Sequence, residues 1–192
     1  AKNDSPLIYE KVAVDLGACV RHAKERLGYR KVVLLGWSGG GSLALFYQSQ
    51  AEHPTITATP AGDPVDLKAA GLWPVDGIVL EAAHRSRART LCDWIDPSVR
   101  NELDPDDRDP EFDLYAPDLA VRPPYPADWL AAYRSAQEQR VRRITAWAQE
   151  TLHTLRRRGT AEVERGFVTH RTMAEPRFLD GSIEPNDRPI GR

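Results

Sequence analysis

The chain has 192 residues, enough for a domain with its own core, and its 41% hydrophobic and 28% charged residues are typical of globular proteins. A formal net charge of −2 provides no cationic surface for nucleic acid and no attraction to an anionic membrane. Two distant cysteines, Cys19 and Cys92, fit neither a disulfide framework nor a metal site and suit a reducing compartment. We therefore expect a cytoplasmic protein with no nucleic-acid or membrane partner.

The first part of the chain predicts helix, strand, helix and strand in that order. Residues 6–27 have an apolar face at helical spacing, and Ser5 can cap the helix. The apolar run 32–35 is typical of a strand buried on both faces of a parallel sheet. Residues 42–51 predict a helix packed on that sheet, and residues 77–83 predict a second buried strand. Together they predict a βαβ unit with a right-handed crossover.

The rest of the chain is less regular. Residues 93–128 are acidic and rich in proline, which predicts an irregular segment whose acid cluster is solvated and does not bind metal. An apolar stripe over residues 128–158 predicts one or two helices that end at Gly159. The arginine runs 140–143 and 156–158 are interpreted as solvated faces of this helix. A short strand is possible at 166–170.

One motif carries a chemical prediction. Gly36-Trp37-Ser38-Gly39-Gly40 matches G-x-S-x-G and lies between the predicted strand and helix. In this motif the serine sits on a strained turn that lifts its hydroxyl above the sheet, and glycine at positions 36 and 40 keeps side-chain bulk out. Two other interpretations are a glycine-rich turn with an incidental serine and a phosphate-binding loop, although no lysine begins the helix as that loop requires.

The stretches 32–44 and 76–83 resemble the nucleophile strand, turn and helix, and the next strand, of the α/β-hydrolase superfamily. The resemblance implies an α/β fold class, a partial α/β-hydrolase fold with a parallel-sheet βαβ core and a helical cap insertion. It implies three parts: a core segment at 1–84, a cap or lid at 85–159 and an irregular return segment at 160–192.

The resemblance also implies a serine hydrolase of carboxylic esters or related small acyl substrates, with no metal and no organic cofactor. Ser38 is then the nucleophile, the Gly39 N–H is an oxyanion donor, and Trp37 borders the acyl pocket. Acyl transfer and C–C bond hydrolysis occur on the same fold and stay open. A non-catalytic binding or scaffold protein on a decayed hydrolase fold is the alternative from another class.

The chain departs from the family in the residues that should activate the serine. The family order places an acid and then a histidine after the serine, each following a further strand. Among the histidines, His84 ends the second predicted strand and His170 lies late in the chain, so both are candidate bases or substrate contacts. Neither has the expected strand context. We therefore expect the catalytic histidine and acid to lie outside this chain, which would be an inactive fragment with exposed apolar sheet surfaces.

Overall fold

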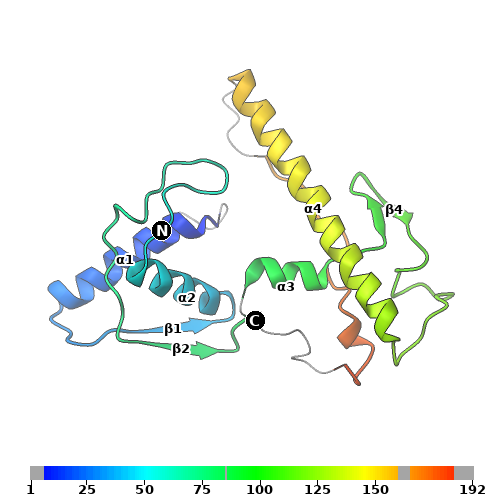
Figure 1. Cartoon of the computed structure of the whole chain (residues 1–192), viewed down its shortest axis with the longest axis horizontal. Helices are drawn as coiled ribbons and strands as arrows, with labels where there is room; N and C mark the ends of the chain where they lie inside the picture. The colour runs from blue at the N-terminus through cyan, green and yellow to red at the C-terminus, as the bar shows by residue number, and fades with distance from the viewer. Residues whose placement is uncertain (1–6, 85, 160–164, 184–192) are drawn as a thin grey trace. The chain divides into compact units, whose positions relative to one another are not determined.

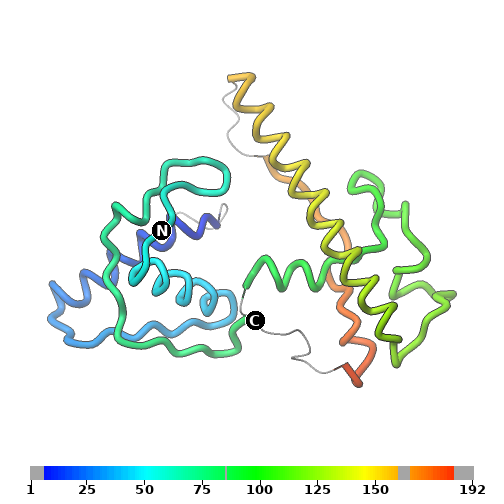
Figure 2. Tube along the Cα trace, in the orientation of Figure 1, coloured from blue at the N-terminus to red at the C-terminus, as the bar shows by residue number. Residues whose placement is uncertain are grey.

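A computed structural model describes residues 7–84, 86–159 and 165–183, so the predicted cap at Ser5 lies outside the described residues. The chain forms two compact units, Ala1–Arg87 and Ala88–Arg192, and each is considered by itself (Figures 1 and 2). Helices and strands are mixed, and two strands pair in parallel, which gives the chain a coarse α/β class.

The first unit contains α1 (Tyr9–Glu25), β1 (Val33–Trp37), α2 (Gly39–Glu52) and β2 (Gly77–Glu81). The strands pair in parallel with Val33 opposite Gly77 and Trp37 opposite Glu81, and α2 forms the crossover between them (Figure 1). The predicted helix–strand–helix–strand order and the βαβ unit are confirmed. The parallel pairing brings the ends of both strands, and the residues that follow them, to the same edge of the sheet.

Within the first unit, the described residues cover one face of the two-stranded sheet. Leu34 and Ile78 pack into an apolar cluster with buried side chains of both helices, so α1 and α2 cover the same face (Figure 1). Val33, Leu35 and Trp37 alternate with the covered positions and are exposed, Leu35 at 63%. The predicted burial of this strand on both faces is therefore wrong, because no other helix or strand described in the first unit lies over the second face.

After β2 the chain forms α3 (Arg87–Trp94), the antiparallel pair β3 (Val99–Asn101) and β4 (Asp104–Arg108), the long α4 (Ala127–Arg158) and the short 3-10 helix η1 (Pro176–Phe178). The single helix α4 confirms the prediction of one or two helices from the apolar stripe over residues 128–158. Its end is also as predicted.

Gly159 caps α4 in a left-handed conformation with φ of 61°. Two other predictions fail in this region. Residues 93–128 are not wholly irregular, since they hold the end of α3 and the β3–β4 pair, and residues 166–170 are extended without strand pairing. The structure divides the chain once, after Arg87, so the predicted cap and return segment share one unit.

The second unit has a core that is partly apolar and partly ionic. Leu114, Tyr125 and Tyr133 belong to its apolar cluster. Beside them, Arg140 is completely buried, so its assignment to a solvated helix face is wrong, whereas Arg156–Arg158 are exposed as predicted. Buried guanidinium groups require paired acids and carbonyls, and these come from segments far along the chain.

The acid cluster takes part in this ionic core. Arg171 forms ion pairs with Asp96 and with Asp113, both of which are buried. Arg134 is paired with Glu175, which has no exposed surface. The part of the acid cluster at Asp113 is therefore structural and not a solvated loop.

Candidate functional site

Ser38 occupies the turn between β1 and α2 in a backbone conformation that L-residues rarely adopt. Its φ of 51° and ψ of −120° lie outside the helical and extended regions. Such a conformation costs about 1–3 kcal/mol and persists only where the surroundings fix it. Here the Ser38 amide donates to the Glu81 carbonyl at 3.1 Å, and the Ser38 carbonyl accepts from the Gly41 amide at 3.2 Å. The turn therefore has the strained geometry that the motif predicts.

Close packing around this turn requires glycine at two positions. A Cβ on Gly36 would lie 2.6 Å from the Gly41 Cα, and a Cβ on Gly41 would lie 2.3 Å from the Cβ of Ala83. A Cβ on Gly40, in contrast, would meet nothing within 4 Å. The crowding predicted at Gly40 is therefore wrong, because α2 turns Gly41 toward the segment after β2.

The N-terminus of α2 lies directly at the serine, since Gly39 is the first residue of the helix. The first N–H groups of a helix have no partner inside it, and the helix dipole is positive there, so this end favours an anion. The Ser42 hydroxyl donates to the Gly39 carbonyl at 2.9 Å, and the Tyr9 hydroxyl lies 3.0 Å from Ser42 Oγ. These contacts hold the first peptide groups of α2 in place.

His84 lies beside the same helix end. A Cβ on Gly39 would be 3.7 Å from both Cε1 and Nε2 of the His84 ring and 3.8 Å from Nη1 of Arg87. The His84 Nδ1 atom is buried and has no hydrogen-bond partner among the described residues. An imidazole and a guanidinium therefore border the first amide of α2, close to the strained serine.

The other predicted residues are not part of this cluster. Trp37 is exposed at the end of β1, on the uncovered face of the sheet. His170 belongs to the second unit, where it lines a cavity and its carbonyl accepts from Arg140. The sequence therefore predicted the serine turn and His84, and the structure brings these together within the first unit.

Two neighbours of the site, Arg87 and Tyr9, were missed in the sequence. Arg87 lies three residues after His84, and the rule that parallel strands end at one edge could have placed it there. Tyr9 belongs to α1, and its hydroxyl forms a hydrogen bond with Ser42, 33 residues further along the chain. No local sequence pattern indicates this contact.

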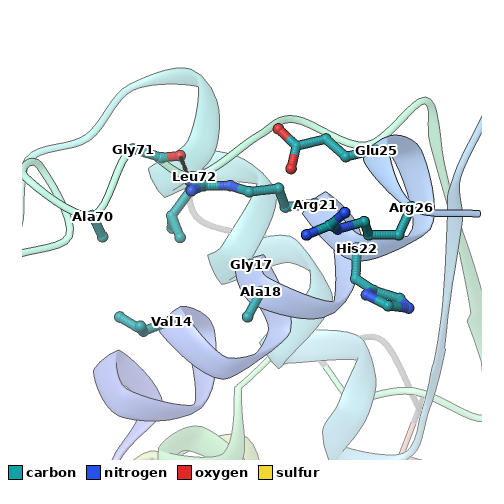
Figure 3. Close-up of a pocket in the computed structure, with 10 residues that line it drawn as sticks. All are labelled: Val14, Gly17, Ala18, Arg21, His22, Glu25, Arg26, Ala70, Gly71 and Leu72. Atoms are coloured by element: carbon teal, nitrogen blue, oxygen red, sulfur yellow. Dashed lines mark hydrogen bonds between the residues drawn. The ribbon is translucent and has the colours of Figure 1, made fainter.

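A separate cavity of about 320 Å³ lies beside α1 (Figure 3). His22 and Arg21 line it, and Arg21 donates to the Gly71 carbonyl at 3.1 Å. Neither Ser38 nor His84 is among its lining residues, so this cavity is not part of the serine site.

No protein-family model, curated protein or solved structure matches this chain. Within the described ranges, no group of three or more His, Cys, Asp or Glu side chains is placed to hold a metal ion. None of the helices described is both long and apolar enough to cross a membrane.

Proposed function

We propose that this chain carries the nucleophile site of an α/β-hydrolase-type serine hydrolase, with carboxylic esters or related small acyl compounds as substrates. The observation that carries the proposal is the backbone of Ser38, with φ of 51° between a parallel strand and a helix N-terminus. In a nucleophile elbow, a strained serine at this place holds its hydroxyl clear of the sheet, where it can attack an acyl group.

In the proposed reaction, Ser38 Oγ attacks the carbonyl carbon of the ester while its proton passes to a base. The carbonyl oxygen becomes an oxyanion that accepts a hydrogen bond from the Gly39 N–H at the positive end of α2. Collapse of this intermediate expels the alcohol, which takes up a proton, and leaves an acyl-serine. Water then attacks the acyl-serine and releases the carboxylic acid and free Ser38. His84 is the described imidazole nearest the turn and is the first candidate base.

A second candidate function is non-catalytic binding of an anionic or acyl group at the same helix end. The specific observation in its favour is His84 Nδ1, which lacks a partner among the described residues. A catalytic imidazole is normally oriented by an acceptor on one ring nitrogen while the other takes the serine proton.

Labelling with a fluorophosphonate probe, followed by peptide mass mapping, separates the two. Hydrolase function predicts an adduct on Ser38 that is absent in Ser38→Ala and retained in Ser49→Ala, a matched change at an exposed serine of α2. If His84 is the base, His84→Gln slows labelling roughly 100-fold or more. A folded chain that gives no adduct rules out His84 as an activating base and a complete catalytic site in this chain, and it favours the binding function or a base supplied from outside the chain.

A further inference from the structure

The second unit contains a cavity of about 660 Å³, within the range of roughly 300–1,000 Å³ common for small-ligand sites. Three segments form its walls: the β3–β4 turn at residues 100–103, the second half of α4 and the extended segment 165–170. The extended segment runs beside α4 (Figure 2). Its lining side chains include Arg100, Leu103, Arg143, Trp147 and Phe167.

Arg140 joins the three walls of this cavity. From α4 it donates through Nε and Nη2 to the Glu102 carboxylate, both at 2.7 Å, and through Nη2 to the His170 carbonyl at 2.9 Å. Its Nη1 atom donates a further hydrogen bond to the Asp96 carbonyl at 2.6 Å. Because the guanidinium is buried and makes four hydrogen bonds, the walls are fixed relative to one another and the cavity is preformed.

Apolar side chains line the cavity although they are exposed to water. Leu103 is 93% exposed, and Trp147, Phe167 and Val168 each expose about half or more of their surface. The rings of Trp147 and Phe167 meet edge to face with centroids 5.0 Å apart. Apolar surface gathered in one hollow favours an apolar ligand group that displaces this water.

The wall of the same cavity also presents a guanidinium group to a ligand. Arg143 lines it with no ion pair to a carboxylate of the described residues. Arg100 also lines it and pairs with Asp107 and Asp109 at 4.0 and 3.5 Å, while the one lining carboxylate, Glu102, is engaged by Arg140. The planar guanidinium matches a carboxylate through two parallel hydrogen bonds. The ligand that complements both features is an amphiphile with an anionic head and an apolar body.

We infer that this cavity binds an apolar carboxylate, with the head at Arg143 and the chain against Trp147 and Phe167. The site lies in the second unit and does not depend on the serine site proposed above. The Ser38→Ala variant therefore binds the same carboxylate unchanged, which separates the two proposals.

The test is isothermal titration of the whole chain with sodium decanoate below its micelle concentration. We expect saturable binding with one ligand per chain. Decyltrimethylammonium, which has the same chain and a cationic head, binds at least tenfold more weakly. Arg143→Gln weakens decanoate binding at least tenfold, whereas Arg142→Gln, the neighbouring exposed arginine outside the cavity, leaves it unchanged.

Circular dichroism checks that the variants are folded. Arg143 also donates to the Val99 carbonyl at 3.1 Å, so Arg100→Gln, at a half-exposed side chain, is the second variant and is expected to weaken binding several-fold. The inference is overturned if decanoate does not saturate the chain, if the cationic amphiphile binds equally well, or if both cavity variants bind decanoate as the Arg142→Gln control does.

Discussion

The guanidinium of Arg140 and the carboxylate of Glu102 form a two-point ion pair in which the arginine has no exposed surface. Loss of one partner of a buried pair leaves the other uncompensated. We expect Glu102→Gln to lower the free energy of unfolding of the second unit by about 3 kcal/mol. Urea unfolding followed by circular dichroism measures this difference.

The matched control for that prediction is Glu150→Gln. Glu150 pairs with Arg157 at 3.4 Å on the exposed side of α4. Surface pairs contribute little, so this variant should shift stability by less than about 0.5 kcal/mol. Equal effects of the two variants would show that the buried pair adds nothing beyond a surface pair.

Replacement of two adjacent glycines of α2 by alanine should change the stability of the first unit in opposite directions. At Gly41 the new Cβ would lie 2.3 Å from the Ala83 Cβ, so Gly41→Ala should destabilise the first unit by about 1–3 kcal/mol. At Gly40 the space is open, and Gly40→Ala should be neutral or stabilising by up to about 1 kcal/mol, since alanine favours the helix. Thermal melts of both variants measure the contrast, and a costly Gly40→Ala would place the crowding where the motif alone predicts it.

The backbone strain at Ser38 predicts that a substitution which relieves it stabilises the protein while it removes the reactive hydroxyl. Glycine adopts a φ of 51° without the clash of a Cβ, whereas alanine keeps the strain and removes only the hydroxyl. We expect Ser38→Gly to be more stable than Ser38→Ala by about 1 kcal/mol. Neither variant should react with the serine probe. Denaturant midpoints of the two variants decide the point, and an alanine variant at least as stable would mean that the turn stores no strain.

The stability of the second unit should fall in acid because of Glu175. Burial alone would raise the pKa of Glu175, but hydrogen bonds and charge from Arg134, with a smaller contribution from Arg177, outweigh burial and hold the pKa below its ordinary value of 4.5. A lowered pKa in the folded state adds stability that is fully present above pH 4.5 and is lost as the pH falls below it.

Urea unfolding at pH 6 and at pH 3.5 tests this dependence. The unmodified chain should lose more stability between these pH values than Glu175→Gln, which cannot ionise at that position. Parallel losses in the two chains would assign the acid sensitivity to other carboxyl groups.

The one-sided cover of the sheet predicts unequal roles for two adjacent leucines. Leu34 packs against the core cluster of the first unit, whereas Leu35 faces away and is exposed. Leu34→Ala should cost about 2–3 kcal/mol of unfolding free energy. Leu35→Ala should change it by less than about 0.5 kcal/mol. Equal costs, measured by denaturation, would mean that both faces of β1 are covered in solution.

The serine turn could be predicted from the sequence because its determinants are local. Gly36, Ser38 and Gly39 lie within four residues, and the flanking apolar runs fix a strand before them and a helix after them. The end of α4 at Gly159 was predictable for the same reason, since a glycine after a long helical stripe favours a left-handed cap.

The failed predictions depend on partners far along the chain. The β3–β4 pair is the exception, since its strands are close in sequence: residues 104–108 consist of aspartate, proline and arginine, which are poor strand formers, yet they pair with β3. Arg140 looked solvated because its acceptors, Glu102 and the carbonyls of Asp96 and His170, lie 30–44 residues away. An apolar run at 32–35 reads the same whether one or both faces are covered, so sequence alone could not reveal the exposed face.

The ionic core of the second unit determines when this unit can fold during synthesis. Arg171 pairs with Asp96 across 75 residues, and Arg134 pairs with Glu175 across 41. While the ribosome is still adding residues before 171, Arg140 of α4 can already pair with Glu102, but Asp96 still lacks Arg171 and Arg134 still lacks Glu175. The core can close only after Glu175 has emerged, so the unit folds late and through contacts of long sequence separation, which slows folding.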